Sequence, residues 1–153
     1  VEDAVDLLAR HQNPGFRLAG IHYLAASRFP DEIEVFAAAL QDSDLRIVSI
    51  ASREIGKRGA EVDRFLLLPL LDHADRGVRL AALHGLGPLV ILDDFPLLLP
   101  FLLPDDREVF RAANQILERS SGELVALDLD PDEERRAEIA VLWISWYEGQ
   151  AQS

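Results

Sequence analysis

The chain contains no cysteine, no methionine and no threonine among its 153 residues. Without cysteine it has no disulfides, no thiolate metal sites and no cysteine nucleophile, and such a composition fits a reducing compartment. We therefore expect a cytoplasmic protein. Because the initiator methionine is missing and Val1 stands first, we expect a fragment or a processed form.

Positive charge and long apolar runs are also scarce. The chain has 15 Lys and Arg against 27 Asp and Glu, a formal net charge of −12. Such a chain repels phosphate backbones at long range, so nucleic acid and anionic membranes are not expected as partners. The longest apolar run, residues 86–103, is interrupted by Asp93, Asp94, Pro96 and Pro100. A spanning helix needs about 20 apolar residues with few interruptions, so no membrane segment is predicted.

What the sequence does contain is an internal repeat. Four segments overlay without gaps, starting at Asn13, Asp42, Asp75 and Asp106. Their starts recur at a nearly regular interval of the length that is typical of a solenoid, in which each unit buries its apolar face against its neighbours. The predicted repeats cover approximately residues 1–28, 29–58, 61–90 and 94–120.

Each column of the overlay has a physical explanation. The four starting residues all have side chains that accept hydrogen bonds from free backbone N–H groups, so they are predicted N-caps of inner helices. Apolar residues follow at the predicted first core position, and small residues follow in the middle of each helix, where another helix can approach closely. The first core positions are Phe16, Leu45, Val78 and Val109, and later ones are Leu24, Leu86 and Leu117.

A second, outer helix is predicted before each inner one. The expected ranges are 2–10, 31–41, 62–71 and 95–103, and in the last two Pro69 and Pro100 occupy equivalent positions. A proline inside a helix removes one hydrogen bond and bends the chain. Short linkers make successive helices antiparallel neighbours. The sequence thus predicts one all-α domain over residues 1–153 with about nine helices.

The pattern Asp75-x-x-Val78-Arg79-x-x-Ala82-x-x-x-Leu86-Gly resembles the short HEAT-like repeats of the phycobilisome-lyase type. The resemblance extends to about residue 120. It implies a right-handed α-α superhelix of about four helical hairpins plus a terminal helix. It also implies that Arg17, Arg46 and Arg79 pair with loop carboxylates of a neighbouring repeat, which makes them structural. The fourth repeat departs from this pattern because Phe110 stands in the arginine column.

No arrangement of residues predicts catalysis. His22 and His84 recur two repeats apart, too far for one metal ion to bridge them. Pairs such as Asp93-Asp94 and Asp105-Asp106 are typical of helix caps. We therefore expect no enzyme, no metal and no cofactor. HEAT-like repeats indicate a fold more strongly than a function. The expected function is a scaffold for a protein partner; the alternative is a lyase or chaperone-type subunit that handles a small ligand such as a bilin.

The predicted binding surface is the concave face, formed by inner-helix residues that point away from the core columns. The partner-binding residues expected there are Leu18, His22, Ile47, Leu80, His84, Arg111 and Gln115. Acidic residues at the rim, Glu54 and Glu118, favour a partner with basic flanks. The alternative for Leu18, Ile47 and Leu80 is sideways packing between adjacent helices.

The last helix, approximately residues 131–149, is apolar over a wide arc that includes Ile139, Leu142, Trp143 and Trp146. Such a helix usually packs on two neighbours. We expect it to cap the repeats; the alternative is a helix that has lost a partner.

Overall fold

The computed structural model describes residues 10–27 and 33–151 of the chain, which fall into two compact units, Val1–Leu89 (unit 1) and Val90–Ser153 (unit 2). Both units are built from helices, and no strand occurs within those described ranges. The all-α prediction is therefore confirmed. The helix expected over residues 2–10 lies outside the described residues.

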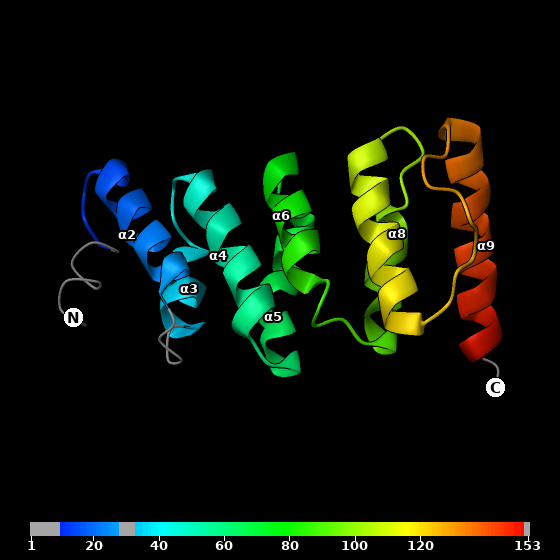
Figure 1. The fold of residues 1–153 in the computed structure, drawn as a ribbon, viewed down its shortest axis with the longest axis horizontal. Coiled ribbons are helices and arrows are strands. Elements are labelled where there is room, and N and C mark those ends of the chain that lie inside the picture. Colours follow the sequence, from blue (N-terminus) through cyan, green and yellow to red (C-terminus); the bar gives the residue numbers. More distant parts are fainter. Residues whose placement is uncertain (1–9, 28–32, 152–153) are drawn as a thin grey trace. The chain divides into compact units, whose positions relative to one another are not determined.

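Unit 1 is built from alternating inner and outer helices. The inner helices are α2 (Pro14–Ala26), α4 (Leu45–Arg58) and α6 (Arg76–Leu86), which lie side by side in Figure 1. The outer elements are α3 (Ile33–Ala39) and the group η1 (Glu61–Asp63), α5 (Arg64–Leu67) and η2 (Leu68–Asp72). Because α4 packs against both α2 and α6, it is the most deeply buried of the three inner helices.

Unit 2 begins with the same outer pattern, η3 (Leu92–Asp94), α7 (Phe95–Leu98) and η4 (Leu99–Phe101). Two long helices follow, α8 (Arg107–Ser121) and α9 (Glu133–Ala151).

The outer helices change from α to 3-10 geometry at their prolines. Pro69 and Pro100 each take the second position of the 3-10 segment, in η2 and η4. Proline has no N–H to donate, and its ring collides with the carbonyl four residues earlier in an α-helix. The chain therefore continues past each proline as a tighter 3-10 helix. The bend predicted from the sequence is thus a change of helix type.

The N-caps establish the true register of the repeats. Asn13, Asp75 and Asp106 accept hydrogen bonds from the backbone N–H of Gly15, Val78 and Val109 respectively. The cap of α4 is Asp44, which accepts from Arg46 N, and not Asp42 as the overlay predicted. With Asp44 in place, the four caps are at positions 13, 44, 75 and 106, and the spacing between them is constant.

The two-residue shift at α4 corrects several predictions at once. Leu45 is 39% exposed and is not a core residue, whereas Ile47, at the third position after its cap, is buried like Val78 and Val109. Phe16 takes the same position in α2 but is 52% exposed. In the corrected register two columns are buried in every repeat. These are the small residues Gly20, Ala51, Ala82 and Ala113 and the large residues Leu24, Ile55, Leu86 and Leu117.

The closest helix contact in unit 1 joins α4 and α6 through two glycines. A Cβ placed on Gly56 would lie 2.1 Å from the carbonyl oxygen of Gly85, and one on Gly85 would lie 2.3 Å from the carbonyl oxygen of Ser52. Only a residue without a side chain allows two backbones to approach this closely.

In unit 2, α8 and α9 run in the same direction. Arg136, in the first turn of α9, donates from Nε to Pro104 O, just before α8, over 2.6 Å. Further along the same pair, Trp143 Nε1 donates to Asn114 Oδ1 over 2.7 Å. The connection, residues 122–132, which we call the strap, therefore returns along the length of α8 (Figure 1). It begins at Gly122, the C-cap of α8, with a left-handed φ of 75°.

Only one side of α9 is covered. Trp143 and Ile139 are buried, and the Phe95 ring of α7 contacts the rings of Trp146 and Tyr147 at 5.9 and 6.1 Å between centroids. Leu142, which the sequence grouped with the packing residues, is instead 42% exposed. The arc of α9 that packs is therefore narrower than its apolar composition suggested.

Candidate functional site

The outward side chains of α2, α4 and α6 form a surface of unit 1 that we call the inner-helix face. In the constant register its two columns are Leu18, Ser49, Leu80 and His22, Arg53, His84. His22, Arg53 and His84 are exposed, whereas Leu18 and Leu80 are half-buried. Four of the residues predicted to bind a partner, Leu18, His22, Leu80 and His84, thus recur at equivalent positions.

Ile47 and Glu54 do not belong to this face. Ile47 is 2% exposed and lines a hollow of about 430 Å³ together with residues of α2 and α3, among them Ile21 and Val35. The sideways packing given as its alternative therefore describes it better. Glu54 is also buried, so it is not a rim residue and gives no support for a partner with basic flanks.

Glu54 has a structural role at the end of α4. Its carboxylate accepts from Lys57 Nζ at 2.7 Å and from Arg58 Nε at 3.1 Å. Arg58 Nη2 also donates to three backbone carbonyls at the end of α2, those of Leu24, Ala25 and Ser27. Arg58 therefore joins two repeats, and the sequence analysis missed it because its partners belong to the preceding repeat.

The predicted arginine ladder exists at one of its three positions. Arg17 Nε donates to Asp42 Oδ2 at 2.7 Å and Arg17 Nη2 to Asp42 Oδ1 at 2.8 Å, which links α2 to the loop before α4. These hydrogen bonds lower the pKa of Asp42, and the same bonds raise the pKa of Arg17. Asp42 is therefore the ladder partner and not the cap that the sequence predicted.

Arg46 and Arg79 make other contacts. Arg46 pairs with Asp44 of its own helix start at 2.6 Å, and its side chain is 68% exposed. Its hydrogen bond lowers the pKa of Asp44 to about 2. Arg79 Nη1 donates to the backbone carbonyls of His73 and Ala74, both at 2.8 Å. Neither contact is the pairing with a neighbouring carboxylate that the resemblance implied.

Repeats one and three have the same set of contacts around the start of the inner helix, which we call the brace: a histidine that accepts from the N-cap backbone N–H, and an arginine that donates to the carbonyl of that histidine. His73 Nδ1 accepts from Asp75 N at 3.0 Å, and His11 Nδ1 accepts from Asn13 N at the same distance. Arg17 Nη1 donates to His11 O at 2.8 Å, as Arg79 does to His73 O. These two histidines therefore serve the cap, while His22 and His84 point outward.

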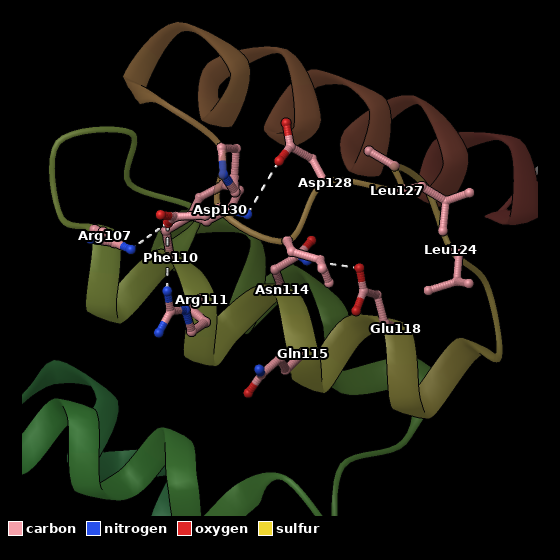
Figure 2. A pocket seen from close by; sticks show the side chains of 13 residues that line it. Arg107, Phe110, Arg111, Asn114, Gln115, Glu118, Leu124, Leu127, Asp128 and Asp130 are labelled. Atoms are coloured by element: carbon pink, nitrogen blue, oxygen red, sulfur yellow. Dashed lines mark hydrogen bonds and ion pairs between the residues drawn. The ribbon is translucent and has the colours of Figure 1, made fainter.

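Arg111 and Gln115, the remaining predicted binding residues, lie in unit 2 beside a hollow of about 170 Å³ between α8 and the strap (Figure 2). At one end of the hollow, Asp130 Oδ1 forms ion pairs with Arg107 Nη2 at 2.5 Å and with Arg111 Nη2 at 3.6 Å. This pairing joins α8 to the strap that follows it. Arg111 therefore holds the strap through Asp130.

Other residues of the strap and of α8 complete the hollow. Asn114 Nδ2 donates to Glu118 Oε1 at 2.8 Å below the strap. Leu127 and Leu129 on the strap are 90% and 100% exposed. The hollow is therefore shallow and mixed in polarity, with its charged groups already paired.

Neither a cluster of metal ligands nor a membrane-spanning helix occurs in the described part of the chain. Over residues 10–27 and 33–151, no group of three or more His, Asp or Glu side chains is placed to hold a metal ion. Across the same ranges, no helix has the length and apolar character that a bilayer-spanning segment requires.

Comparison with known families agrees with this geometry. The sequence profile of the HEAT repeats matches residues 1–87, which is more than half of the chain. The chain belongs to the HEAT repeat family. HEAT repeats are commonly scaffolds for protein interactions and are generally not enzymes. No curated protein matches the chain.

Proposed function

We propose that this HEAT repeat chain is a non-catalytic scaffold that binds a peptide or helix of a partner protein on its inner-helix face. The observation that carries the proposal is the row of exposed side chains His22, Arg53 and His84, which recurs once per repeat. All three repeats of unit 1 place a nitrogen donor at this position, although exposure alone would allow any polar side chain there. Half-buried Leu18 and Leu80 beside the row offer apolar surface that a bound segment would cover.

The resemblance to the phycobilisome-lyase type of repeat is compatible with this proposal and does not carry it. A subunit that handles a small ligand such as a bilin would bury most of that ligand in a deep pocket. The inner-helix face is instead an open row of side chains on three neighbouring helices. We therefore prefer the scaffold.

The test is affinity purification of the full chain from its source cells, followed by mass spectrometry. Wild type is compared with the paired variant Leu80→Asp and His84→Ala, whose melting temperature must match that of wild type. The control variant is Leu127→Asp, which introduces the same charge at an exposed leucine of unit 2.

We expect proteins that copurify with wild type and with the control to be lost from the paired variant. Equal recovery with all three would contradict the proposal. A copurified chromophore, seen as visible absorbance, would favour the small-ligand alternative. Because Leu80 is half-buried, the exposed pair Arg53→Ala and His84→Ala replaces the first variant if that variant melts early.

A further inference from the structure

The inner helices of unit 1 carry charge opposite to that of the chain as a whole. Between them α2, α4 and α6 hold seven basic residues, about half of the 15 in the protein, and one acidic residue. The basic residues are Arg17, Arg46, Arg53, Lys57, Arg58, Arg76 and Arg79. The acidic residue is Glu54, which is buried and paired with Lys57 and Arg58. Four of these basic side chains are held by carboxylates: Arg17 by Asp42, Arg46 by Asp44, and Lys57 and Arg58 by Glu54. Arg53 is the positive charge that this layer presents in the exposed row.

The row His22, Arg53 and His84 consists of hydrogen-bond donors without a carboxylate of their own. No hydrogen bond or ion pair joins these three side chains to any residue within 10–27 or 33–151. A guanidinium only donates, and an imidazole donates from at least one ring nitrogen, so all three can bind carboxylate oxygens. Three exposed donors at one repeat position, on three neighbouring helices, form a surface suited to an external acceptor.

The spacing of the row indicates what kind of molecule could carry the acceptor groups. Packed helices lie about 8 to 10 Å apart, so successive donors are separated by about 10 Å. An α-helix rises about 1.5 Å per residue, so side chains seven residues apart on one face are also about 10 Å apart. A helix that crosses α2, α4 and α6 therefore places carboxylates at positions i, i+7 and i+14 over the row. Apolar residues between those positions would meet Leu18 and Leu80.

We propose that the row His22, Arg53 and His84 binds an amphipathic helix whose acidic residues recur every seven positions. This rests on the proposed function, and it names the chemistry of the partner. A phosphate polymer would offer a much denser charge and would be repelled at long range by the rest of the protein. Isolated carboxylates on an apolar helix avoid most of that repulsion and fit the mixture of donors and leucines on this face.

The test uses a synthetic helical peptide with glutamate at three positions seven residues apart and leucine on the same face between them. A matched peptide carries glutamine at the three positions. Binding to the full chain is measured by fluorescence anisotropy of the labelled peptide. We expect the glutamate peptide to bind, the glutamine peptide to bind about tenfold more weakly, and the affinity to fall as salt rises.

Variants of the row must reproduce the effect of changing the peptide. We expect Arg53→Ala to weaken binding of the glutamate peptide about tenfold, with a further loss when His22→Ala and His84→Ala are added. All three side chains are exposed, so the melting temperature should not change. The matched control is Arg119→Ala, an exposed arginine of α8, which should leave the affinity as it is.

Three outcomes would overturn the proposal. The first is that the glutamate peptide does not bind, and the second is that the two peptides bind with equal affinity. The third is that the Arg53→Ala variant binds the glutamate peptide as tightly as wild type does. A single-stranded RNA oligonucleotide that binds more tightly than the peptide, and that loses affinity in Arg53→Ala, would assign the row to phosphate instead. If the peptide fails while the copurified proteins are still lost from the Leu80→Asp and His84→Ala variant, the scaffold proposal stands and only the acidic helix is wrong.

Discussion

Replacing Gly85 by alanine adds one methyl group at the closest approach of α4 and α6. The new Cβ would lie 2.3 Å from the carbonyl oxygen of Ser52 and 2.8 Å from Cδ1 of Leu67. Leu67 is completely buried, and the carbonyl belongs to a helix backbone, so neither can move aside alone. The two helices must separate by about 1 Å, which weakens dispersion contacts along their whole interface.

The expected cost follows from two opposing effects. Overpacking of a tight core site costs about 1 to 3 kcal/mol, and a backbone collision belongs at the upper end of that range. Alanine returns about 1 kcal/mol because it favours the helix over glycine. We therefore expect Gly85→Ala to lower the free energy of unfolding by about 2 kcal/mol, which in a chain of this size lowers Tm by about 4 to 8 °C.

Urea denaturation followed by circular dichroism at helix wavelengths measures this change directly. The control is Gly149→Ala, in helix α9, where an added Cβ meets no atom within 4 Å. That variant should be neutral or more stable by a few tenths of a kcal/mol. If Gly85→Ala were as stable as wild type with an unchanged dependence on urea, the close approach of α4 and α6 would not be a constraint, and the explanation of both glycines would fail.

Two further predictions concern the charged contacts. Arg79→Ala should lower the free energy of unfolding by about 1 to 3 kcal/mol because two loop carbonyls lose a charged donor. Arg46→Ala removes an exposed side chain and should change the free energy of unfolding by less than about 0.5 kcal/mol. Equal melting temperatures of the two variants would contradict this prediction. The lowered pKa values of Asp42 and Asp44 predict stability that is complete above about pH 4, the ordinary range for aspartate, and that falls as pH decreases toward about 2. Asp42→Asn should therefore be less stable at pH 7 and should lose less on acidification than wild type, as read from urea midpoints at pH 7 and pH 3. An unchanged pH dependence would show that the Arg17 contact does not form in solution.

Most of the fold could be predicted because its signals are local. Capping residues such as Asn13 and Asp75 act within one turn, and prolines such as Pro69 act on the helix that contains them. The predicted register of α4 was wrong, and the reason is also local. Both Asp42 and Asp44 can cap a helix, and the overlay chose the first of them, although only the second keeps the spacing constant.

The candidate site was harder to predict than the fold. The shift at α4 moved Ile47 from the expected surface into the core and left Arg53, which the sequence analysis had not named, in the exposed row. Arg58 and Arg136 bind carbonyls that are distant along the chain, so no spacing in the sequence indicates their role. The exposed histidines were found because they recur at one offset and do not depend on tertiary contacts.

The brace at His11 and His73 occurs in alternate repeats, the first and the third. The segment that begins at His11 and the one that begins at His73 share His, Gly, Arg, Leu, Ala, His and Leu in the same order and spacing. The segment between them, from Asp42 onward, has none of these residues at those places. A designer who wished to lengthen this protein should therefore copy four helices at a time, because a single inserted hairpin would place a braced helix start beside another of the same kind and would break the alternation.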